Sequence, residues 1–181
     1  LAGPDSRSGQ GWNIQHDGPE FLRALVETLK RIYPVDPKRV YVFGHSAGAI
    51  HALSIGLLES EYFAAVAVHA GALAPEAMSF VSRAPRKIPV ALWVGTNDQF
   101  FPLDLVRGTT KVLEVKGFAP KLTEMPGKSG REQQRGAYVK AVFEQEKLKV
   151  STDSIGNIIG VRKGTGGGPT IVIMAHMDVV F

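Results

Sequence analysis

The sequence predicts an α/β fold in which a parallel sheet is flanked by helices and followed by a smaller α+β segment. Three observations predict it. Short apolar runs typical of buried strands alternate with segments whose apolar residues recur at helical spacing. A glycine-rich pentapeptide joins one of these strands directly to a helix, and the character of the chain changes near residue 128. Because strands that alternate with helices form parallel sheets, we expect helices on both faces of the sheet.

The expected elements follow one another closely. The predicted strands are 39–44, 63–68, 88–94 and 119–125, and the predicted helices are 21–32, 49–58 and 103–115. Asp17 can cap the first helix, and Pro19 suits its first turn. Residues 75–82 form a short helix or a loop.

A boundary at about residue 128 divides the chain into domains 1–127 and 128–181. The second begins with a predicted helix over 131–147, whose inward positions we expect to be Ala137, Val139, Val142 and Phe143. Residues 148–150 and 155–161 are expected to pair as a hairpin with its turn near Gly156. A last apolar run, 170–175, reads as a strand.

Composition excludes several classes of protein. The 181 residues are 44% hydrophobic and carry a net charge of +4 with scattered basic residues, so we expect a folded core and no nucleic-acid partner. No cysteine is present, which excludes disulfides and cysteine nucleophiles but does not decide the compartment. No apolar run is long enough to cross a membrane. The chain starts at Leu1 without a signal peptide, as if inside a domain.

The pentapeptide Gly44-His45-Ser46-Ala47-Gly48 has the G-x-S-x-G pattern between a predicted strand and a predicted helix. This is the context of a nucleophile elbow, in which a sharp turn exposes the serine Oγ. Glycines at both ends allow strand and helix to approach closely. The N–H of Ala47, at the helix N-terminus, is the expected oxyanion donor.

A serine nucleophile also needs an acid and a base. Asp98 follows the strand 88–94 at the carboxyl edge of the sheet, where open α/β sheets build their sites, so we expect it to be the acid. Its alternative role is to cap the turn before Phe100. The usual order is serine, acid, histidine, yet no histidine lies between Asp98 and His176. The candidate bases are His69, which ends a strand at the site edge and would break that order, and His176, far beyond the acid.

The remaining histidines have other expected roles. His45 is expected to pack beside the serine, His51 to lie in the core or at the surface, and His16 to be solvated. Trp12, Trp93 and the pair Phe100-Phe101 either line an aromatic acyl or aryl pocket or pack in the core.

Two stretches, 35–48 and 89–98, make residues 1–127 resemble the C-terminal part of an α/β-hydrolase of the esterase, polyhydroxybutyrate-depolymerase and feruloyl-esterase group. The resemblance implies hydrolysis of a small-molecule ester or acyl substrate through a Ser46 acyl-enzyme, with Asp98 as acid and no cofactor. It also allows a secreted protein. Compared with that family, the chain lacks the N-terminal strands, the second oxyanion loop and the triad histidine. We therefore expect impaired catalysis, and open sheet edges that favour self-association.

The C-terminal part carries a second pattern in Asp153, the stretches 156–160 and 164–169, and the end of the chain, 175–181. With these residues, 131–181 resembles the N-terminal part of a zinc peptidase of the aminoacylase and glutamate-carboxypeptidase type. The resemblance implies that His176 binds one metal ion and that Asp178 orients it. Because a zinc site needs at least three protein ligands, zinc is expected only if the site is completed elsewhere.

Three functions are therefore open: a serine esterase, a fragment of a zinc-dependent amino- or carboxypeptidase, and a non-catalytic composite or pseudo-enzyme. A base near Ser46 separates the first from the third, and residues beyond Phe181 would decide the second. The esterase is preferred, because its pattern covers more of the chain.

Overall fold

We describe the chain from a computed structural model. The structure describes residues 2–9, 11–126, 132–168, 170, 172–175 and 177. It divides into two compact units. The first is Leu1–Val94 with Gln99–Glu124, and the second is Gly95–Asp98 with Met125–Phe181. Each unit is described by itself below, and the domain assignment 1–127 and 128–181 stays a prediction.

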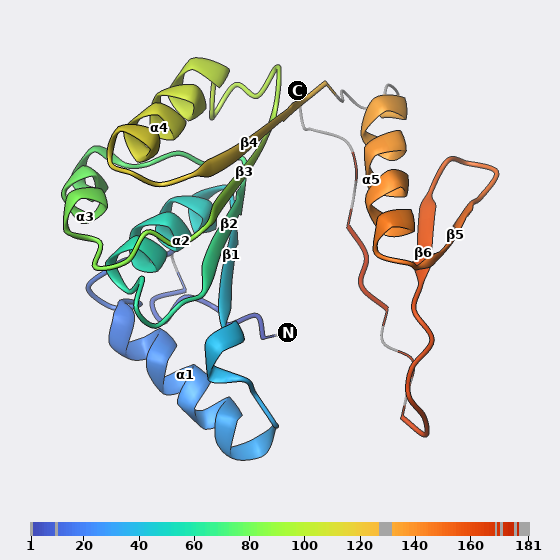
Figure 1. Ribbon diagram of the computed structural model, residues 1–181, viewed down its shortest axis with the longest axis horizontal. Helices are drawn as coiled ribbons and strands as arrows, with labels where there is room; N and C mark the ends of the chain where they lie inside the picture. Colours follow the sequence, from blue (N-terminus) through green and yellow to red (C-terminus); the bar gives the residue numbers. More distant parts are fainter. Residues whose placement is uncertain are drawn as a thin grey trace. The chain divides into compact units, whose positions relative to one another are not determined.

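The first unit is built on a four-stranded parallel sheet, as the sequence predicts (Figure 1). Its strands, in spatial and in chain order, are β1 (Tyr41–His45), β2 (Ala65–His69), β3 (Val90–Gly95) and β4 (Pro120–Met125). The register aligns Gly44 with Val68 and Val68 with Leu92. Because all connections return to the same edge, the carboxyl ends of these strands lie together.

Helices connect the strands. They are α1 (Pro19–Ile32), η1 (Pro37–Arg39), α2 (Ala47–Leu58), η2 (Pro75–Ala77), α3 (Met78–Arg83) and α4 (Leu103–Val115). Helix α2 is buried almost all round and fills the centre of the unit, with Leu53, Ile55 and Leu57 inaccessible to solvent. Alternate strand residues such as Val66 and Leu92 complete the core. The hydrophobic effect of this burial holds the helix layer on the sheet.

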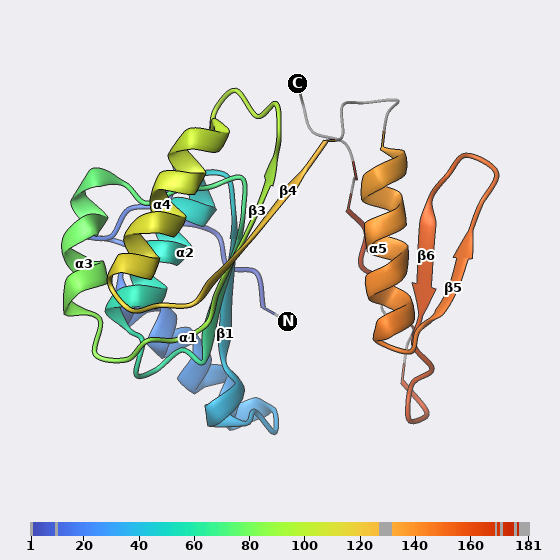
Figure 2. The same ribbon diagram turned by 45° about the horizontal axis from the view of Figure 1, so that its top comes forward.

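Helices α2, α3 and α4 lie on one side of the sheet (Figure 2). The opposite face of β1 is open, because the side chains of Tyr41 and Phe43 on it are 62% and 65% exposed. Gly44, on the face towards the helices, is buried. The expected cover on both faces is therefore absent at β1 in the described residues. Helices α2, α3 and α4 all lie on the other side of the sheet, so none of them covers this face.

Helix α1 makes polar contacts with the residues that follow α2. None of its residues is fully buried. The Tyr62 hydroxyl donates to the Glu27 carboxylate at 2.8 Å, and Arg23 pairs with Glu59. The helix is capped by Gly18 rather than by Asp17, whose carboxylate is turned to other donors described below. The expected cap at Asp17 is therefore wrong.

The second unit contains helix α5 (Gln133–Gln145) and an antiparallel hairpin of β5 (Lys149–Thr152) and β6 (Ile158–Val161). The ring of Phe143 in α5 lies against Gly160 of β6, so closely that a Cβ on Gly160 would lie 2.5 Å from the Phe143 ring. Val139 and Val142 are also half-buried, as expected, but Ala137 is exposed, so its assignment to the inner face is wrong. The buried residues of α5 are Arg135 and Gly136, in its first turn.

The hairpin turn is shaped by Asp153. Its carboxylate accepts hydrogen bonds from the side chain and backbone of Asn157 at 2.8 Å each, and these bonds lower the pKa of Asp153. Gly156 takes a φ of 94°, which glycine adopts without strain. The predicted hairpin is confirmed, but the described residues of 170–175 form no strand. No described helix is long and apolar enough to span a membrane.

Candidate active site

Ser46 occupies the junction between β1 and α2. Its backbone angles are φ 54° and ψ −124°, a conformation that non-glycine residues rarely adopt and that costs about 1–3 kcal/mol. The Ser46 N–H donates to the carbonyl of His69 at 3.0 Å, and its own carbonyl accepts from Ala49 at 2.8 Å. These bonds tie the residue to the neighbouring strand and to the helix at once. Ser46 is exposed. The strand, strained serine and helix together have the form of a nucleophile elbow.

Gly44 makes the close approach of strand and helix possible. A Cβ at this position would lie 2.2 Å from the carbonyl oxygen of Gly48 and 2.7 Å from the Cβ of Ala52. Real Cβ atoms do not come so close, so β1 can approach α2 only without a side chain here. Gly48 differs from the expectation, because a Cβ there would meet only the Trp12 indole nitrogen at 3.5 Å. The steric requirement therefore falls on Gly44.

Ala47 is the first residue of α2, and it is exposed like Ser46. The first N–H groups of a helix have no partner within the helix, and the helix dipole makes this end electropositive. The Ala47 N–H is therefore suited to stabilise an oxyanion formed at Ser46. Its role as an oxyanion donor stays a prediction.

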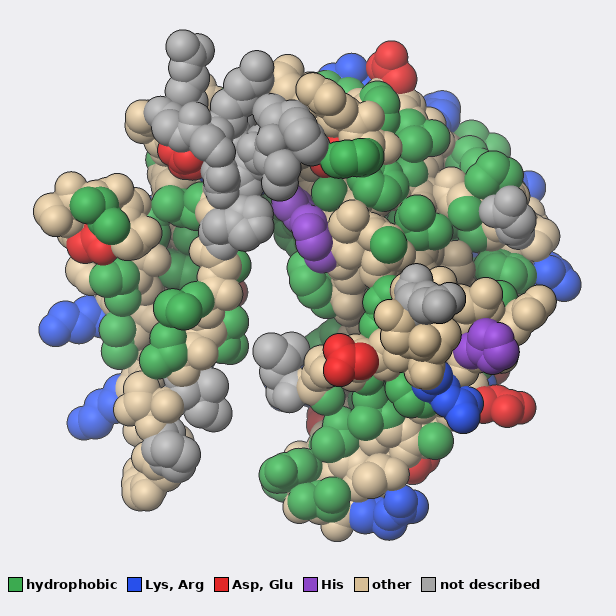
Figure 3. Space-filling model, turned by 180° about the vertical axis from the view of Figure 1, so that it is seen from behind, with side chains coloured by type: hydrophobic (Ala, Val, Ile, Leu, Met, Phe, Trp, Pro, Cys, Tyr) green, Lys and Arg blue, Asp and Glu red, His purple; other side chains and the backbone are tan. Residues whose placement is uncertain are grey.

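Two histidines stand side by side next to the elbow. His45 ends β1 and His69 ends β2, and the strand register places them opposite each other. Their Nδ1 atoms are 2.9 Å apart, and their rings are inclined by only 16°. One ring must donate a proton and the other accept it. Figure 3 shows histidine side chains at the surface in more than one place. The sequence places both residues at strand ends, but only the register between the strands brings them together.

Asp98 lies three residues beyond β3, in the short segment that groups with the second unit. Its N–H donates to the carbonyl of Gly95 at 3.1 Å, which closes a turn directly after the strand. The residue therefore follows the carboxyl end of a strand, as expected. Its pairing with a catalytic base stays a prediction.

The loop before α1 packs against the start of α2. The ring of Trp12 stacks on the ring of His51 at 5.1 Å, and His51 Nε2 donates to the carbonyl of Asp17 at 3.0 Å. The Asp17 carboxylate accepts from the N–H groups of Arg7 and Asn13, and these bonds lower the pKa of Asp17. This cluster could not be predicted from the sequence, because nothing in the spacing of these residues indicates that they meet.

His51 provides a test of this packing by pH. Burial lowers the pKa of His51 below its ordinary value of 6.5. Between these two pKa values, His51 is protonated in the unfolded chain but neutral in the folded chain. The free energy of unfolding should therefore fall as pH drops from about 6.5 towards the lower pKa of the folded state. We expect His51→Gln, which keeps a donor, to lose this part of the slope. Urea unfolding of both proteins between pH 5 and 8 measures it, and parallel curves would contradict the prediction.

The expected aromatic pocket has mixed support. Phe101 is buried and Phe100 is 71% exposed, while Trp12 and Trp93 are half-buried. The burial of Phe101 agrees with a packing role. A role of the others in substrate binding stays a prediction.

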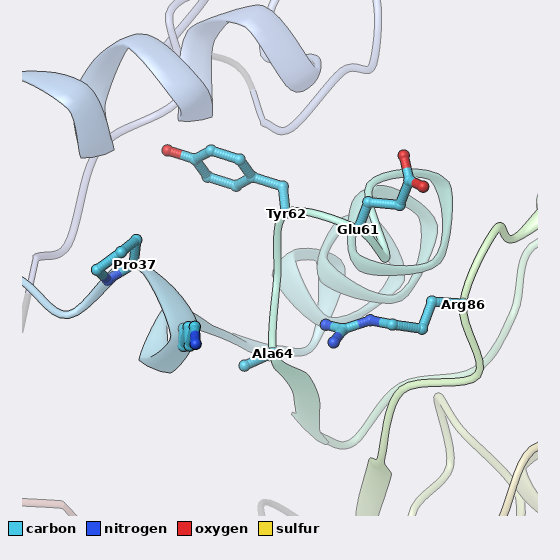
Figure 4. Close-up of a pocket in the computed structure, with 6 residues that line it drawn as sticks. Pro37, Glu61, Tyr62, Ala64 and Arg86 are labelled. Carbon is cyan, nitrogen blue, oxygen red and sulfur yellow. The ribbon is translucent and has the colours of Figure 1, made fainter.

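A surface pocket of about 280 Å³ lies elsewhere (Figure 4). Its lining residues come from η1, from the loop before β2 and from Arg86 before β3. It is therefore at the amino edge of the sheet, opposite the edge that carries Ser46. The Arg86 guanidinium donates to the carbonyls of Ser60 and Phe63 at 2.9 Å each, so it fastens the loop after α2. Another pocket, of about 300 Å³, involves Arg7 and His16 and is not lined by Ser46.

His176 and Asp178, the predicted metal-site residues, lie outside the described residues. Within the part of the chain that the structure describes, no three histidine, aspartate or glutamate side chains gather as a protein zinc site requires. The described residues therefore do not supply the zinc site that the second resemblance implies.

The part of the chain that contains the elbow matches a known protein family. A family model described as Phospholipase/Carboxylesterase matches residues 15–138, which include β1, Ser46 and all four strands of the sheet. The chain belongs to the phospholipase/carboxylesterase family. The expected α/β-hydrolase relationship is thereby confirmed, and the esterase, depolymerase and feruloyl-esterase grouping within it stays a prediction.

Solved structures of α/β-hydrolases share this fold. Arabidopsis thaliana SOBER1 is 21% identical with a TM-score of 0.52, and the match covers 67% of this chain and 59% of SOBER1. Esterase PE8 is 26% identical with a TM-score of 0.52, over 61% of this chain and 51% of PE8. Pyrococcus horikoshii acylaminoacyl peptidase is 19% identical with a TM-score of 0.51, over 61% and 23%. The matches thus span less than two thirds of each of these proteins.

A curated protein is related through a shorter stretch. The putative [LysW]-lysine/[LysW]-ornithine hydrolase of Pyrococcus abyssi is 33% identical over 63 residues, which are 35% of this chain and 18% of that protein. This partial similarity is distant, and it concerns a class of hydrolase different from the carboxylesterases.

Proposed function

We propose that this protein is a serine esterase that hydrolyses carboxylic esters of small molecules through an acyl-enzyme on Ser46. One observation carries the proposal: Ser46 is exposed with a φ of 54° between a parallel strand and the start of a buried helix. A structural serine gains nothing from this strain, whereas a nucleophile gains access to substrate. The family relationship supports the same chemistry.

The reaction follows from the groups around the elbow. The Ser46 Oγ attacks the ester carbonyl carbon, its proton passes to a base, and the carbonyl oxygen becomes an oxyanion facing the Ala47 N–H. When the intermediate collapses, the bond to the alcohol breaks and the alcohol takes the proton from the base. Water then attacks the acyl-enzyme in the same manner and releases the carboxylic acid. No cofactor takes part in this scheme.

His69 is the proposed base, and Asp98 is the proposed acid that orients the base. His69 stands at the end of β2, its carbonyl holds the Ser46 N–H, and its ring is bonded to His45. A neighbouring imidazole can share the proton taken from serine, as an orienting group does in other triads. The chain order of these residues would then be serine, histidine, acid, which differs from the usual order of the fold.

The proposal is tested with a fluorophosphonate probe, which reacts with activated serines. We expect mass spectrometry to find the label on Ser46 in the folded chain, and labelling to slow at least about 100-fold in His69→Gln. His16→Gln, which alters an exposed histidine distant in sequence, should label like the wild type. Folded protein without label at Ser46 would overturn the proposal and favour a non-catalytic composite or pseudo-enzyme.

A second candidate function, that of a zinc-dependent peptidase fragment, is favoured by the similarity to the Pyrococcus abyssi hydrolase. We infer that His176 and Asp178 would belong to its metal site, with the other ligands supplied elsewhere. Elemental analysis of the purified chain and of His176→Ala tests this. Zinc that is retained by the wild type and lost in the variant would support the site, and equal zinc in both would contradict it.

Self-association is a further part of the proposal. The open face of β1 carries Tyr41 and Phe43, and the strand lies at the edge of the sheet. Exposed edges and apolar faces favour pairing with another chain. We infer association of copies at this strand, and no nucleic-acid or membrane partner.

A further inference from the structure

The paired histidines at the ends of β1 and β2 have a geometry that the esterase chemistry does not require. A base needs one imidazole near the serine, but here two lie with Nδ1 atoms 2.9 Å apart. Two nitrogens bound to one metal ion at about 2.0–2.1 Å and at angles of about 90–109° are separated by about 2.9–3.4 Å. The distance between the Nδ1 atoms of His45 and His69 therefore matches that between two imidazole nitrogens bound to one metal ion.

We propose that His45 and His69 form a bidentate site for a divalent transition-metal ion, Cu²⁺ foremost, beside the nucleophile elbow. Imidazole suits copper, zinc and nickel, and affinity among these ions is highest for Cu²⁺. No third histidine or carboxylate of the described residues joins the pair. Water molecules therefore complete the coordination of the ion.

The backbone beneath the two rings is held in place. His45 is followed by Ser46, whose N–H is bonded to the His69 carbonyl at 3.0 Å. His69 is followed by Ala70, whose φ is 50° and whose N–H donates a hydrogen bond to the backbone carbonyl of Trp93 at 2.8 Å. The strands thus fix the distance between the two side chains before any ion binds, which lowers the entropic cost of chelation.

Small movements of the rings complete the site. The ring centroids are 5.0 Å apart and the planes are inclined by 16°, so the Nδ1 edges face each other. Each ring turns about its Cβ–Cγ bond, a torsion with a broad energy profile, until both lone pairs point to the ion. The proton between the Nδ1 atoms moves to Nε2 of its own ring. A neutral pair therefore binds the ion without releasing a net proton.

Exposure permits this rearrangement. His45 is exposed and His69 is half-buried, and both side chains stand on the face of β1 and β2 opposite the core. The alternation of strand side chains places Phe43 and Tyr41 in the same row as His45. An ion can therefore reach the pair from solvent without opening the helix layer.

The proposal is independent of esterase activity, because binding is measured directly. Tag-free chain is titrated with Cu²⁺ alone by calorimetry, and electron paramagnetic resonance of the complex reports the nitrogen ligands. We expect one site with two imidazole nitrogens. Since the second imidazole binds the ion in an intramolecular step, removing either should weaken binding at least about 100-fold. The variants are His45→Ala and His69→Ala, each checked for native circular dichroism.

Two matched variants locate the site. His16→Ala removes an exposed histidine of the N-terminal loop, and His176→Ala removes the predicted zinc ligand. Both should keep the wild-type affinity for this site. A double variant lacking His45 and His69 should bind little more weakly than either single variant, because the chelate is already broken. Wild-type affinity in His45→Ala and His69→Ala, or an equal loss in either control variant, would overturn the proposal.

Discussion

Ser46→Ala is expected to reduce ester hydrolysis more than about 10³-fold and to abolish labelling by fluorophosphonates, because no other group can form the acyl-enzyme. Residual turnover would come from the Ala47 N–H and from substrate binding alone. The substitution removes only Oγ from an exposed side chain, so the fold should be preserved. Initial rates with a series of p-nitrophenyl esters measure the effect.

Ser54→Ala is the matched control for this result. Ser54 lies on the same helix and its hydroxyl donates to the carbonyl of Ile50 at 2.9 Å, so its removal costs a local hydrogen bond and touches no proposed catalytic group. It should hydrolyse esters at the wild-type rate. Hydrolysis by Ser46→Ala at that same rate would remove Ser46 from the mechanism, even in a chain that remains an esterase.

Gly44→Ala is expected to destabilise the protein by about 3 kcal/mol, the upper part of the range for overpacked cores. The new Cβ would meet the carbonyl oxygen of Gly48 at 2.2 Å, and this oxygen belongs to the backbone of α2, which cannot turn aside as a side chain does. Either β1 or α2 must move. The elbow moves with them, so labelling of Ser46 should fall together with stability. Thermal and urea unfolding measure the first effect, and probe labelling measures the second.

Gly108→Ala is the comparison for that variant. Gly108 lies within α4, and a Cβ there would meet nothing within 4 Å. Because alanine favours a helix more than glycine does, this variant should gain about 0.5–1 kcal/mol. Equal unfolding midpoints for Gly44→Ala and the wild type would show that strand and helix are not held as closely as the structure describes.

Much of the fold could be predicted from local patterns. The four strands and the helices α2 and α4 lie within a few residues of their predicted limits, because buried parallel strands are short apolar runs and helices repeat every 3.6 residues. Ser46 was predicted for the same reason, since a strand, G-x-S-x-G and a helix are adjacent in the chain. The sequence places Ala137 on the wrong face, because the polar and apolar residues of its helix are only weakly separated between faces.

Contacts between distant segments could not be predicted. The bond between His45 and His69 depends on the register of two strands, and the stacking of Trp12 on His51 depends on how a loop folds over a helix. The position of Asp17 before a helix predicts a cap, yet its carboxylate accepts hydrogen bonds from the N–H groups of Arg7 and Asn13. In each case several partners were available, and spacing along the chain does not choose among them.

The sequence by itself determined the α/β class, the succession of strands and helices along the chain and the elbow at Ser46, because each depends on residues that are neighbours in the chain. The tertiary structure alone decided which residues meet at the end of the sheet: that the steric requirement falls on Gly44 and not on Gly48, that Trp12 stacks on His51, and that His45 pairs with His69. Those features arise from packing between segments far apart in sequence. Their geometry is fixed only when the strands pair and the helix closes on them.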